Sequence, residues 1–252
     1  MRIRILLSTI VLTALCCGFS LPAHSIMLVS RSQEVSIGKQ VEASMIKEYG
    51  GLSKDKALTE RVARVGKQVG QISPRQDITY TYKVVNSEEV NAFAAPGGPI
   101  VITQRLAKML KTDGELAFVL AHETGHIAAQ HGRKAINQAL IAQNVAALLL
   151  RNSGDAMRIG ANVMYTLYTR GYSRDQEYEA DNYGYQLMTK AGYNAEQGIK
   201  ALAKLGIKRT SGVDKYLSTH PDIPDRIDRI AKMSNIPDDR KKELIDKAQA
   251  EK

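Results

Sequence analysis

The sequence predicts an α+β fold that is mostly helical and carries one small antiparallel β-sheet. Apolar residues recur with the period of an α-helix over most of the chain, and they alternate as in a β-strand in only two short segments. Of the 252 residues, 44% are hydrophobic, as in ordinary globular proteins. A chain of this length and composition can bury a sizeable core, so the disordered and fibrous classes are excluded.

The first 25 residues differ from the rest and are typical of a secretory signal peptide. Two arginines among the first four residues precede an apolar run from Ile5 to Leu15, and Ala23-His24-Ser25 offers the small residues that a signal peptidase inspects. We therefore expect residues 1–25 to be a signal peptide and residues 26–252 to form a single domain. An uncleaved anchor is less favoured, because the run is shorter than the roughly 20 apolar residues of a membrane span.

Both cysteines, Cys16 and Cys17, lie inside this expected signal peptide. The residues before them lack the leading leucine and small residue expected in front of a lipid-modified cysteine. A lipid-anchored or membrane-tethered form is therefore less favoured than a freely secreted one. After cleavage the chain would hold no cysteine, which excludes disulfides, thiolate metal sites and cysteine nucleophiles. Any metal must be held by nitrogen and oxygen ligands.

The charge of the chain is mildly basic. The formal net charge of +9 falls to +7 when the two N-terminal arginines are removed, and the remaining charges are mixed apart from the cluster Arg240-Lys241-Lys242. This excess suits contact with a negatively charged membrane surface. No motif that reads nucleic acid accompanies it, so no nucleic acid is expected as a partner.

The first half of the expected domain is predicted to be a helical hairpin followed by two strands. Residues 33–49 and 56–72 space their apolar side chains at the helical period, with two glycines between them. Residues 78–85 and 99–103 have the pattern of β-strands, and the glycine-rich segment 91–98 joins them. We expect these two strands to form the small antiparallel sheet, with a turn at the glycines.

The second half is predicted to be helical. Thr112, followed three residues later by Glu115, is the capping-box pattern that opens a helix, and Gly132 is its expected stop. Ser173 with Gln176 repeats the pattern. The other helical segments are expected over residues 135–150 and 156–168, from Ser173 to about Gly192, and from about Asn194 and Asp222 onward, with Asp222 as a cap.

The helix opened by Thr112 contains His122-Glu123-Thr124-Gly125-His126, the HExxH pattern. Four residues advance a helix by about 400°, so the two imidazoles lie on the same face and can bind one zinc ion. Glu123 lies beside them without being a ligand, which is the position of a general base for the attacking water. The alternative is a buried helix whose two histidines are satisfied within the core.

A catalytic zinc site needs a third protein ligand and an open position. His131 lies five residues beyond His126, where a continuing helix would turn it about 140° away from the two histidines. The long metzincin motif would need a histidine at position 132, which is Gly132. We therefore interpret His131 as a cation at the helix C-terminus and expect the third ligand elsewhere.

Two acidic residues of the segment Ser173–Asp181 are the better candidates. Glu177 and Asp181 are four residues apart and share one helix face, whereas Glu179 points to nearly the opposite side. We expect Glu177 to be the third zinc ligand and Asp181 to hydrogen-bond a ligand histidine, which fixes its tautomer. Glu179 is expected to have no part in the site. Without the HExxH pattern, this segment would be interpreted as a solvated acidic helix face.

His220 is expected to complete the catalytic set with Glu123 and Asp181. Of five histidines, one would leave with the signal peptide, two would bind zinc and one would end a helix. His220 would either donate a hydrogen bond to the developing oxyanion or close over zinc as a fourth ligand in a resting state. The alternative is a loop histidine that shapes the turn with Pro221.

An HExxH helix followed some fifty residues later by Glu-x-x-Ala-Asp resembles a known family, as do four further segments, Glu34–Gly38, Asn91–Ala94, Pro96–Gly98 and Thr219–Pro221 with Arg226. The family is the gluzincin metallopeptidases that include HtpX, the CAAX prenyl endopeptidases and Oma1. The resemblance covers nearly the whole mature chain and is closest to single-domain periplasmic LoiP-like members. It implies a zincin-type metallopeptidase domain whose small sheet edges the active-site cleft, in the periplasm of a Gram-negative bacterium.

The expected function is that of a zinc-dependent endopeptidase with one Zn²⁺ per chain. The resemblance implies quality control of envelope proteins, with unfolded or misfolded proteins as substrates and outer-membrane assembly proteins as candidate partners. The strand over residues 99–103, or the segment 91–95, is expected to pair with extended substrate backbone. Two alternatives are a zinc-containing chaperone or assembly factor with minor proteolysis, and a zinc hydrolase acting on a non-peptide bond. A pure binding role needs no base, so Glu123 argues against it.

Overall fold

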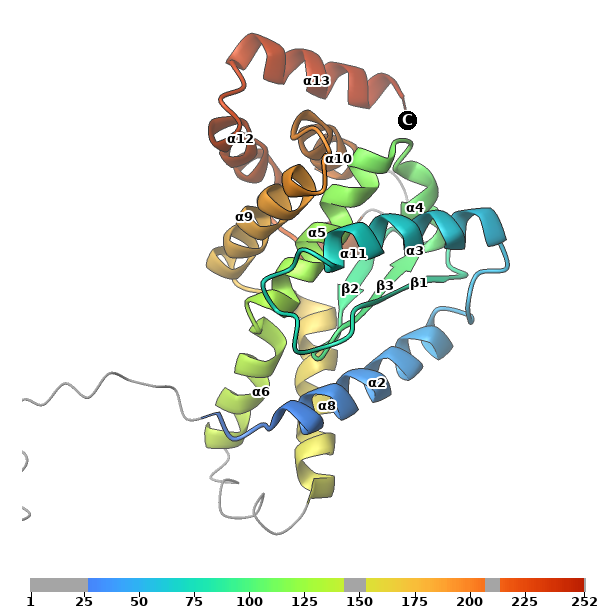
Figure 1. The fold of residues 1–252 in the computed structure, drawn as a ribbon, viewed down its shortest axis with the longest axis vertical. Helices are drawn as coiled ribbons and strands as arrows, with labels where there is room; N and C mark the ends of the chain where they lie inside the picture. The colour runs from blue at the N-terminus through green and yellow to red at the C-terminus, as the bar shows by residue number, and fades with distance from the viewer. Residues whose placement is uncertain (1–26, 143–152, 207–213, 252) are drawn as a thin grey trace, which may run out of the picture.

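The structure is a computed structural model that describes residues 27–142, 153–206 and 214–251 (Figure 1). The expected signal peptide and part of the helix expected over residues 135–150 lie outside these ranges. Within them, none of the helices combines the length and the apolar character that crossing a lipid bilayer requires.

Two N-terminal helices form where the sequence predicts them. α2 (Arg31–Glu48) begins with a capping box, in which the side chains of Ser30 and Gln33 each accept a hydrogen bond from the backbone N–H of the other residue. α3 (Lys56–Gly70) begins after Asp55, whose carboxylate accepts the third backbone N–H beyond it. Each observed end lies within two residues of the predicted one.

The sheet has three strands in the order β1-β3-β2, namely β1 (Thr81–Val85), β2 (Ala92–Ala94) and β3 (Pro99–Thr103). β2 and β3 are antiparallel across a turn at Gly97 and Gly98, whose φ angles of 77° and 126° favour glycine. β1 and β3 are parallel, so the antiparallel pairing expected for these two strands is wrong. The glycine turn joins β3 to β2, a strand that the sequence pattern did not predict, and the sheet is therefore mixed.

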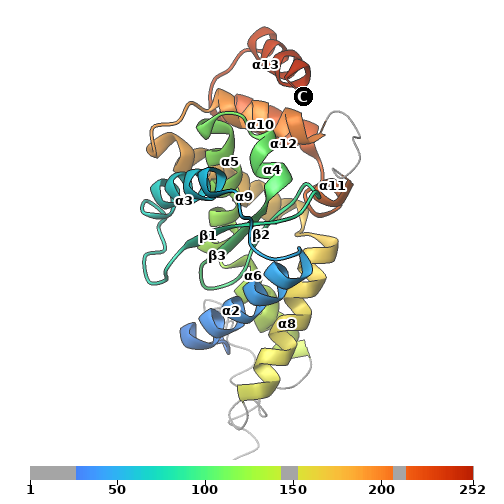
Figure 2. The same ribbon diagram turned by 90° about the vertical axis from the view of Figure 1, so that its right-hand side faces the viewer.

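Alternate residues of the sheet face two separate cores. Ile100 and Ile102 of β3 pack in the core that includes α3, whereas Val101 packs in the core that includes α2. The two N-terminal helices thus lie on opposite sides of the strands and do not form the expected hairpin (Figure 2). Each helix buries its apolar face against the sheet instead. Because both faces of β3 are covered, its successive residues are all buried.

The other regular elements of the described chain are helices, which confirms the mostly helical α+β class. Capping boxes at Thr112–Glu115 and Ser173–Gln176 open α5 and α9, as predicted. Asp222 precedes α12 as predicted, but its carboxylate pairs with Arg174 and does not cap the helix. The helices are α4 (Gln104–Met109), α5 (Asp113–Ala128), α6 (His131–Ala142), α8 (Ser153–Arg170), α9 (Arg174–Lys190), α10 (Glu196–Gly206), α11 (Asp214–Thr219), α12 (Ile223–Met233) and α13 (Asp238–Ala250).

The end of α5 differs from the prediction. The helix stops at Ala128, because Gln130 adopts a left-handed φ of 59° and turns the chain. A new helix, α6, begins one residue later at His131, so Gly132 lies inside α6 and does not stop α5. The sequence could not show this turn, since the residue in the left-handed conformation is not a glycine.

α5 runs through the centre of the molecule, in contact with the sheet, α3, α9 and α10 (Figure 1). A buried ion pair holds its first turn: the Lys204 ammonium group of α10 donates to Oε1 of Glu115 at 2.8 Å, and both side chains are at most 1% exposed. The other oxygen of Glu115 accepts the backbone N–H of Lys111 at 2.7 Å. The start of α5 is therefore tied to α10 and to the preceding turn.

We predict that Lys204→Ala lowers the free energy of unfolding by about 3–5 kcal/mol, because the Glu115 carboxylate stays buried without its cation. Equilibrium urea denaturation measures this change. Lys200→Ala is the matched control on the same helix: its ammonium group lies 3.7 Å from the partly exposed carboxylate of Glu251, so the loss should stay below about 1 kcal/mol. Equal losses in the two variants would contradict the anchoring role of the buried pair.

Candidate metal centre

α5 carries two buried histidines that face each other. His122 and His126 lie one helical turn apart, and their Nε2 atoms are separated by 3.1 Å. Neither side chain is more than 1% exposed. Two imidazole nitrogens directed at one point are the arrangement in which a histidine pair binds a metal ion.

α9 packs closely on α5 and brings a carboxylate to the same point. A Cβ atom at Gly125 would lie only 2.9 Å from the carbonyl oxygen of Ala180, so this close approach requires glycine. The Glu177 carboxylate then reaches both histidines: Oε2 lies 3.5 Å from Nε2 of His122, and Oε1 lies 3.3 Å from Nε2 of His126.

The spacing of these three donors fits a single zinc ion. Zinc bonds of 2.0–2.2 Å at tetrahedral angles put neighbouring donors roughly 3.3–3.6 Å apart, and the observed separations run from 3.1 to 3.5 Å. Both oxygens of Glu177 are buried and make no hydrogen bond of normal geometry, which leaves them available to a cation. His220 belongs to the same cluster, since one donor atom from each of the four residues lies within 4.8 Å of the others.

Asp181 and Arg226 support the outer nitrogen of His122. Oδ1 of Asp181 lies 2.9 Å from Nδ1 of His122, and Arg226 donates to both Asp181 oxygens at 2.7 Å. Burial raises the pKa of Asp181, but the Arg226 charge and the hydrogen bond from His122 lower it by more, to about 2. The carboxylate is therefore ionised, and it accepts the Nδ1 proton that a metal-binding imidazole carries.

Arg226 lies in α12 and is completely buried. Its Nη1 lies 3.3 Å from Oε2 of Glu177, so one guanidinium contacts both carboxylates of α9 that face the histidines. The sequence offered only its presence in a segment shared with the resembled family. A contact across 45 residues, between Asp181 and Arg226, leaves no local pattern that could have revealed this role.

The electrostatic surroundings of the two histidines differ. Burial and the Arg226 cation lower the pKa of His122, but the hydrogen bond to Asp181 and the nearby carboxylate of Glu177 raise it by more, to about 9. Burial lowers the pKa of His126 to about 4. Glu177 stays ionised, because the charge of His220 and the close approach of the two histidines hold its pKa well below the usual range despite burial. The carboxylates thus attract positive charge to the point where the donors meet.

Glu123 and His220 face each other beside these donors. Nε2 of His220 lies 3.4 Å from Oε1 of Glu123, its Nδ1 lies 2.9 Å from the Thr219 hydroxyl, and its ring stacks on Tyr216 at 4.3 Å. Burial raises the pKa of Glu123, but the hydrogen bond and charge of His220 lower it by more. The structure therefore brings the histidine of the loop before α12 to the candidate base, as the sequence predicts.

His131 does not lie where the sequence predicts. Because the chain turns at Gln130, His131 folds back on α5, with its Nδ1 2.9 Å from Nδ1 of His126 and its Nε2 3.0 Å from Oε2 of Glu179. The interpretation of His131 as a cation at a helix end is wrong: the residue is 1% exposed, and burial lowers its pKa by more than Glu179 raises it. Glu179 lies on the exposed face of α9, as predicted, and it approaches the metal donors only through its contact with His131.

Tyr172 is a further site residue that the sequence did not reveal. It lies between α8 and α9, and its ring stacks on His126 with centroids 4.1 Å apart and planes at 19°. Contact with a flat ring restricts rotation of the imidazole. A single tyrosine in a short connection has no pattern that predicts such a contact.

A cavity of about 10 Å³ borders this cluster, lined by Glu123, Tyr172 and His220 together with the edge strand β2. This volume is at the lower limit of room for one water molecule. A peptide cannot enter this cavity in the conformation that the structure shows.

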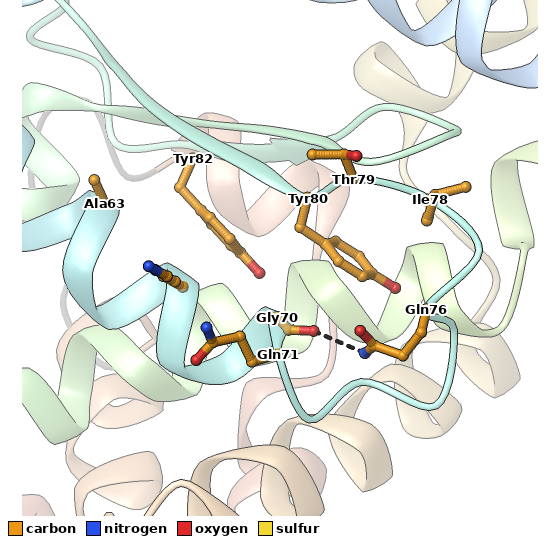
Figure 3. A pocket seen from close by; sticks show the side chains of 9 residues that line it. Ala63, Gly70, Gln71, Gln76, Ile78, Thr79, Tyr80 and Tyr82 are labelled. Atoms are coloured by element: carbon orange, nitrogen blue, oxygen red, sulfur yellow. Dashed lines mark hydrogen bonds between the residues drawn. The ribbon is translucent and has the colours of Figure 1, made fainter.

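A larger open groove of about 420 Å³ lies away from these donors, between α3 and the segment that leads into β1 (Figure 3). Tyr80 and Tyr82 form one side, and Gln76, which donates to the carbonyl oxygen of Gly70 at 3.2 Å, closes one end. Its walls include no carboxylate and no imidazole. The groove therefore lacks the groups that hydrolysis requires, and the histidine cluster is the candidate site.

Comparison with known proteins agrees with this geometry. The profile of peptidase family M48 matches residues 53–234. The mitochondrial metalloendopeptidase OMA1 of Arabidopsis thaliana is 37% identical over 147 residues, which cover 58% of this chain and 30% of that protein. The metalloprotease YcaL of Escherichia coli is 26% identical over 214 residues, 83% of each chain. The β-barrel assembly-enhancing protease of Yersinia pestis is 26% identical over 213 residues, 78% of this chain and 43% of that protein.

The chain spans only 30% and 61% of the length of the OMA1 proteins of Arabidopsis thaliana and Schizosaccharomyces pombe. The match of the family profile, in contrast, extends over most of this chain and includes every residue of the histidine cluster. The zinc cofactor expected from the sequence is confirmed by this family and by the donor set. The chain belongs to peptidase family M48.

Proposed function

We propose that the protein is a zinc-dependent endopeptidase in which His122, His126 and Glu177 bind one zinc ion and Glu123 is the general base. The observation that carries this proposal is the spacing of the three donors, 3.1–3.5 Å around one point, with the Glu123 carboxylate 3.4 Å from His220 of the same cluster. When bound there, zinc supplies a Lewis acid that polarises the scissile carbonyl and acidifies the attacking water. The names of the relatives, metalloendopeptidase and metalloprotease, support the same activity.

Glu123 accepts the proton of the attacking water. Its carboxylate is ionised at neutral pH, because His220 offsets the effect of burial on its pKa. The same carboxyl group then delivers the proton to the amine nitrogen that leaves. Asp181 does not touch the substrate in this mechanism, and it acts through His122 by holding the imidazole in one tautomer.

Both roles that the sequence suggests for His220 are compatible with its position in the structure. Its Nε2 faces Glu123, where a donor could reach the oxyanion that develops on the scissile carbonyl. The same nitrogen lies close enough to the donor cluster to become a fourth ligand in a resting state. The two roles predict opposite effects of removing the imidazole.

The edge strand β2 is the candidate surface for substrate backbone. Asn91, Ala92 and Phe93 line the small cavity together with Glu123. β3 lies between the other two strands and has no free edge, so the segment 91–95 is the remaining candidate of the two considered from the sequence. Pairing with an edge strand gives affinity without reading many side chains, which suits unfolded or loop segments of proteins.

We further propose that residues 1–25 direct export, that residues 26–252 form one domain, and that the mature protein acts in the periplasm of a Gram-negative bacterium. Its substrates would be unfolded or misfolded envelope proteins, and outer-membrane assembly proteins are candidate partners. The similarity to a β-barrel assembly-enhancing protease supports this role. Comparison of envelope proteomes from cells with wild-type protein and with Glu123→Gln would identify the substrates.

We predict that Glu123→Gln retains stoichiometric zinc and loses at least about 100-fold in turnover, because the base is removed and no ligand is touched. Casein hydrolysis and metal analysis of the purified protein measure the two quantities. A hydrolase of non-peptide bonds would cleave no casein even as wild type. Retained turnover in the variant would contradict the assignment of Glu123 as the general base. The alternative function of an assembly factor would then be favoured.

The two carboxylates of α9 should behave differently. We predict that Glu177→Ala abolishes zinc binding, since a ligand is lost, whereas Asp181→Ala lowers zinc affinity or activity by about 10- to 100-fold. Competition with a fluorescent chelator measures the affinities. Exchanged phenotypes would mean that the two roles must be exchanged.

Removal of the His220 imidazole separates its two roles. If His220 donates to the oxyanion, His220→Ala should retain zinc and lose about 10²- to 10³-fold in turnover. If His220 is a resting-state ligand, the variant should be more active than wild type. Steady-state kinetics with a peptide substrate distinguish these results, and unchanged kinetics with unchanged zinc affinity would leave only a loop histidine that shapes the turn with Pro221.

A further inference from the structure

Three side chains form a continuous hydrogen-bonded path from the metal donors to the surface. Nδ1 of His126 lies 2.9 Å from Nδ1 of His131, and Nε2 of His131 lies 3.0 Å from Oε2 of Glu179. His126 and His131 are each at most 1% exposed, whereas the Glu179 side chain is 48% exposed. The path thus begins in the core and ends at a solvated carboxylate.

Only one arrangement of protons fits this path when His126 binds a metal through Nε2. The Nδ1 atom of His126 then carries the proton and must donate it. His131 has to accept at its own Nδ1, so its proton lies on Nε2, from which it donates to the Glu179 carboxylate. Each atom along the path has one partner of the correct kind, and both imidazoles are neutral.

We propose that His131 and Glu179 are positioning residues that hold His126 in the tautomer and orientation required for zinc. The inference deepens the proposed function, because it assigns a supporting pair to one of the proposed ligands. It rests on geometry: two hydrogen bonds of normal length in series, in a region where an unmatched polar atom would be costly.

The two ligand histidines are then supported by different means. His122 donates directly to Asp181, a buried carboxylate that Arg226 neutralises. His126 reaches its carboxylate through a second imidazole, and that carboxylate is partly in water. The electronic effect of Glu179 on zinc should therefore be weaker than that of Asp181, although its effect on ring orientation remains.

The turn at Gln130 makes this path possible. On a continuing helix His131 would point away from His126, but the left-handed residue ends α5 and lets α6 start with His131 against it. Tyr172 stacks on the face of the same imidazole at 4.1 Å. The ring of His126 is therefore restrained both at its edge and on its face.

The first test measures zinc affinity of the full-length protein by chelator competition. We expect Glu179→Ala to lower the affinity by about 10-fold, and Glu179→Gln to stay within about threefold of wild type, because the amide oxygen still accepts the His131 proton. Asp175→Ala is the matched control, since it removes another exposed carboxylate from the same helix without a contact to the cluster, and its affinity should be unchanged. Wild-type affinity in Glu179→Ala would overturn the proposal.

The second test reads the protons directly in the wild-type protein, so it does not depend on how a variant folds. Long-range ¹H–¹⁵N correlation spectra of the zinc-loaded protein should show Nδ1 protonated on His126 and only Nε2 protonated on His131. A proton on Nδ1 of His131 with zinc bound would overturn the proposal. Neither measurement uses proteolysis, so a protein that binds zinc but cleaves no peptide would refute the proposed function and still decide the role of His131 and Glu179.

Discussion

Three carboxylates, those of Glu123, Glu177 and Asp181, are buried around the paired histidines, and the guanidinium of Arg226 lies among them as counter-charge. Imidazoles that bind a metal are neutral, so the three carboxylates and the one guanidinium would then carry a net charge of −2. Buried charge of this kind is strongly unfavourable unless a cation compensates it. A doubly charged metal ion at the meeting point of the donors provides that compensation. The surrounding helices are the scaffold that brings these charges together.

That scaffold depends on α5. The helix is buried along almost its whole length, the Glu115–Lys204 pair fixes its first turn, and the sheet and α3 cover one side of it. Its Gly125 lets α9 approach closely enough for Glu177 to reach both histidines. The same contacts therefore serve stability and site geometry, because the residues that anchor α5 also fix the position and orientation of its two histidines relative to Glu177.

The features that could be predicted from the sequence are those with a local signature. Capping boxes marked the starts of α5 and α9, and the spacing of four residues put His122 with His126, and Glu177 with Asp181, on shared helix faces. The parallel pairing of β1 with β3 could not be predicted, because β2 is only three residues long and left no strand pattern in the sequence. Without β2, the glycine turn was assigned to the connection between β1 and β3, although it joins β2 to β3. The path through His131 depends on one left-handed glutamine, and the Arg226 contact joins residues 45 apart. Neither leaves a pattern in neighbouring residues.

The cluster draws on three separate stretches of chain, and Arg226 comes last. During synthesis from the N-terminus, a nascent chain that has reached residue 200 already carries both ligand histidines, Glu177 and Asp181, but lacks the guanidinium that pairs with both carboxylates. Closing α9 onto α5 at that stage would desolvate two carboxylates with no counter-ion from the chain. An incomplete chain therefore lacks the cation of the buried cluster until α12 has been synthesised and has packed against α9.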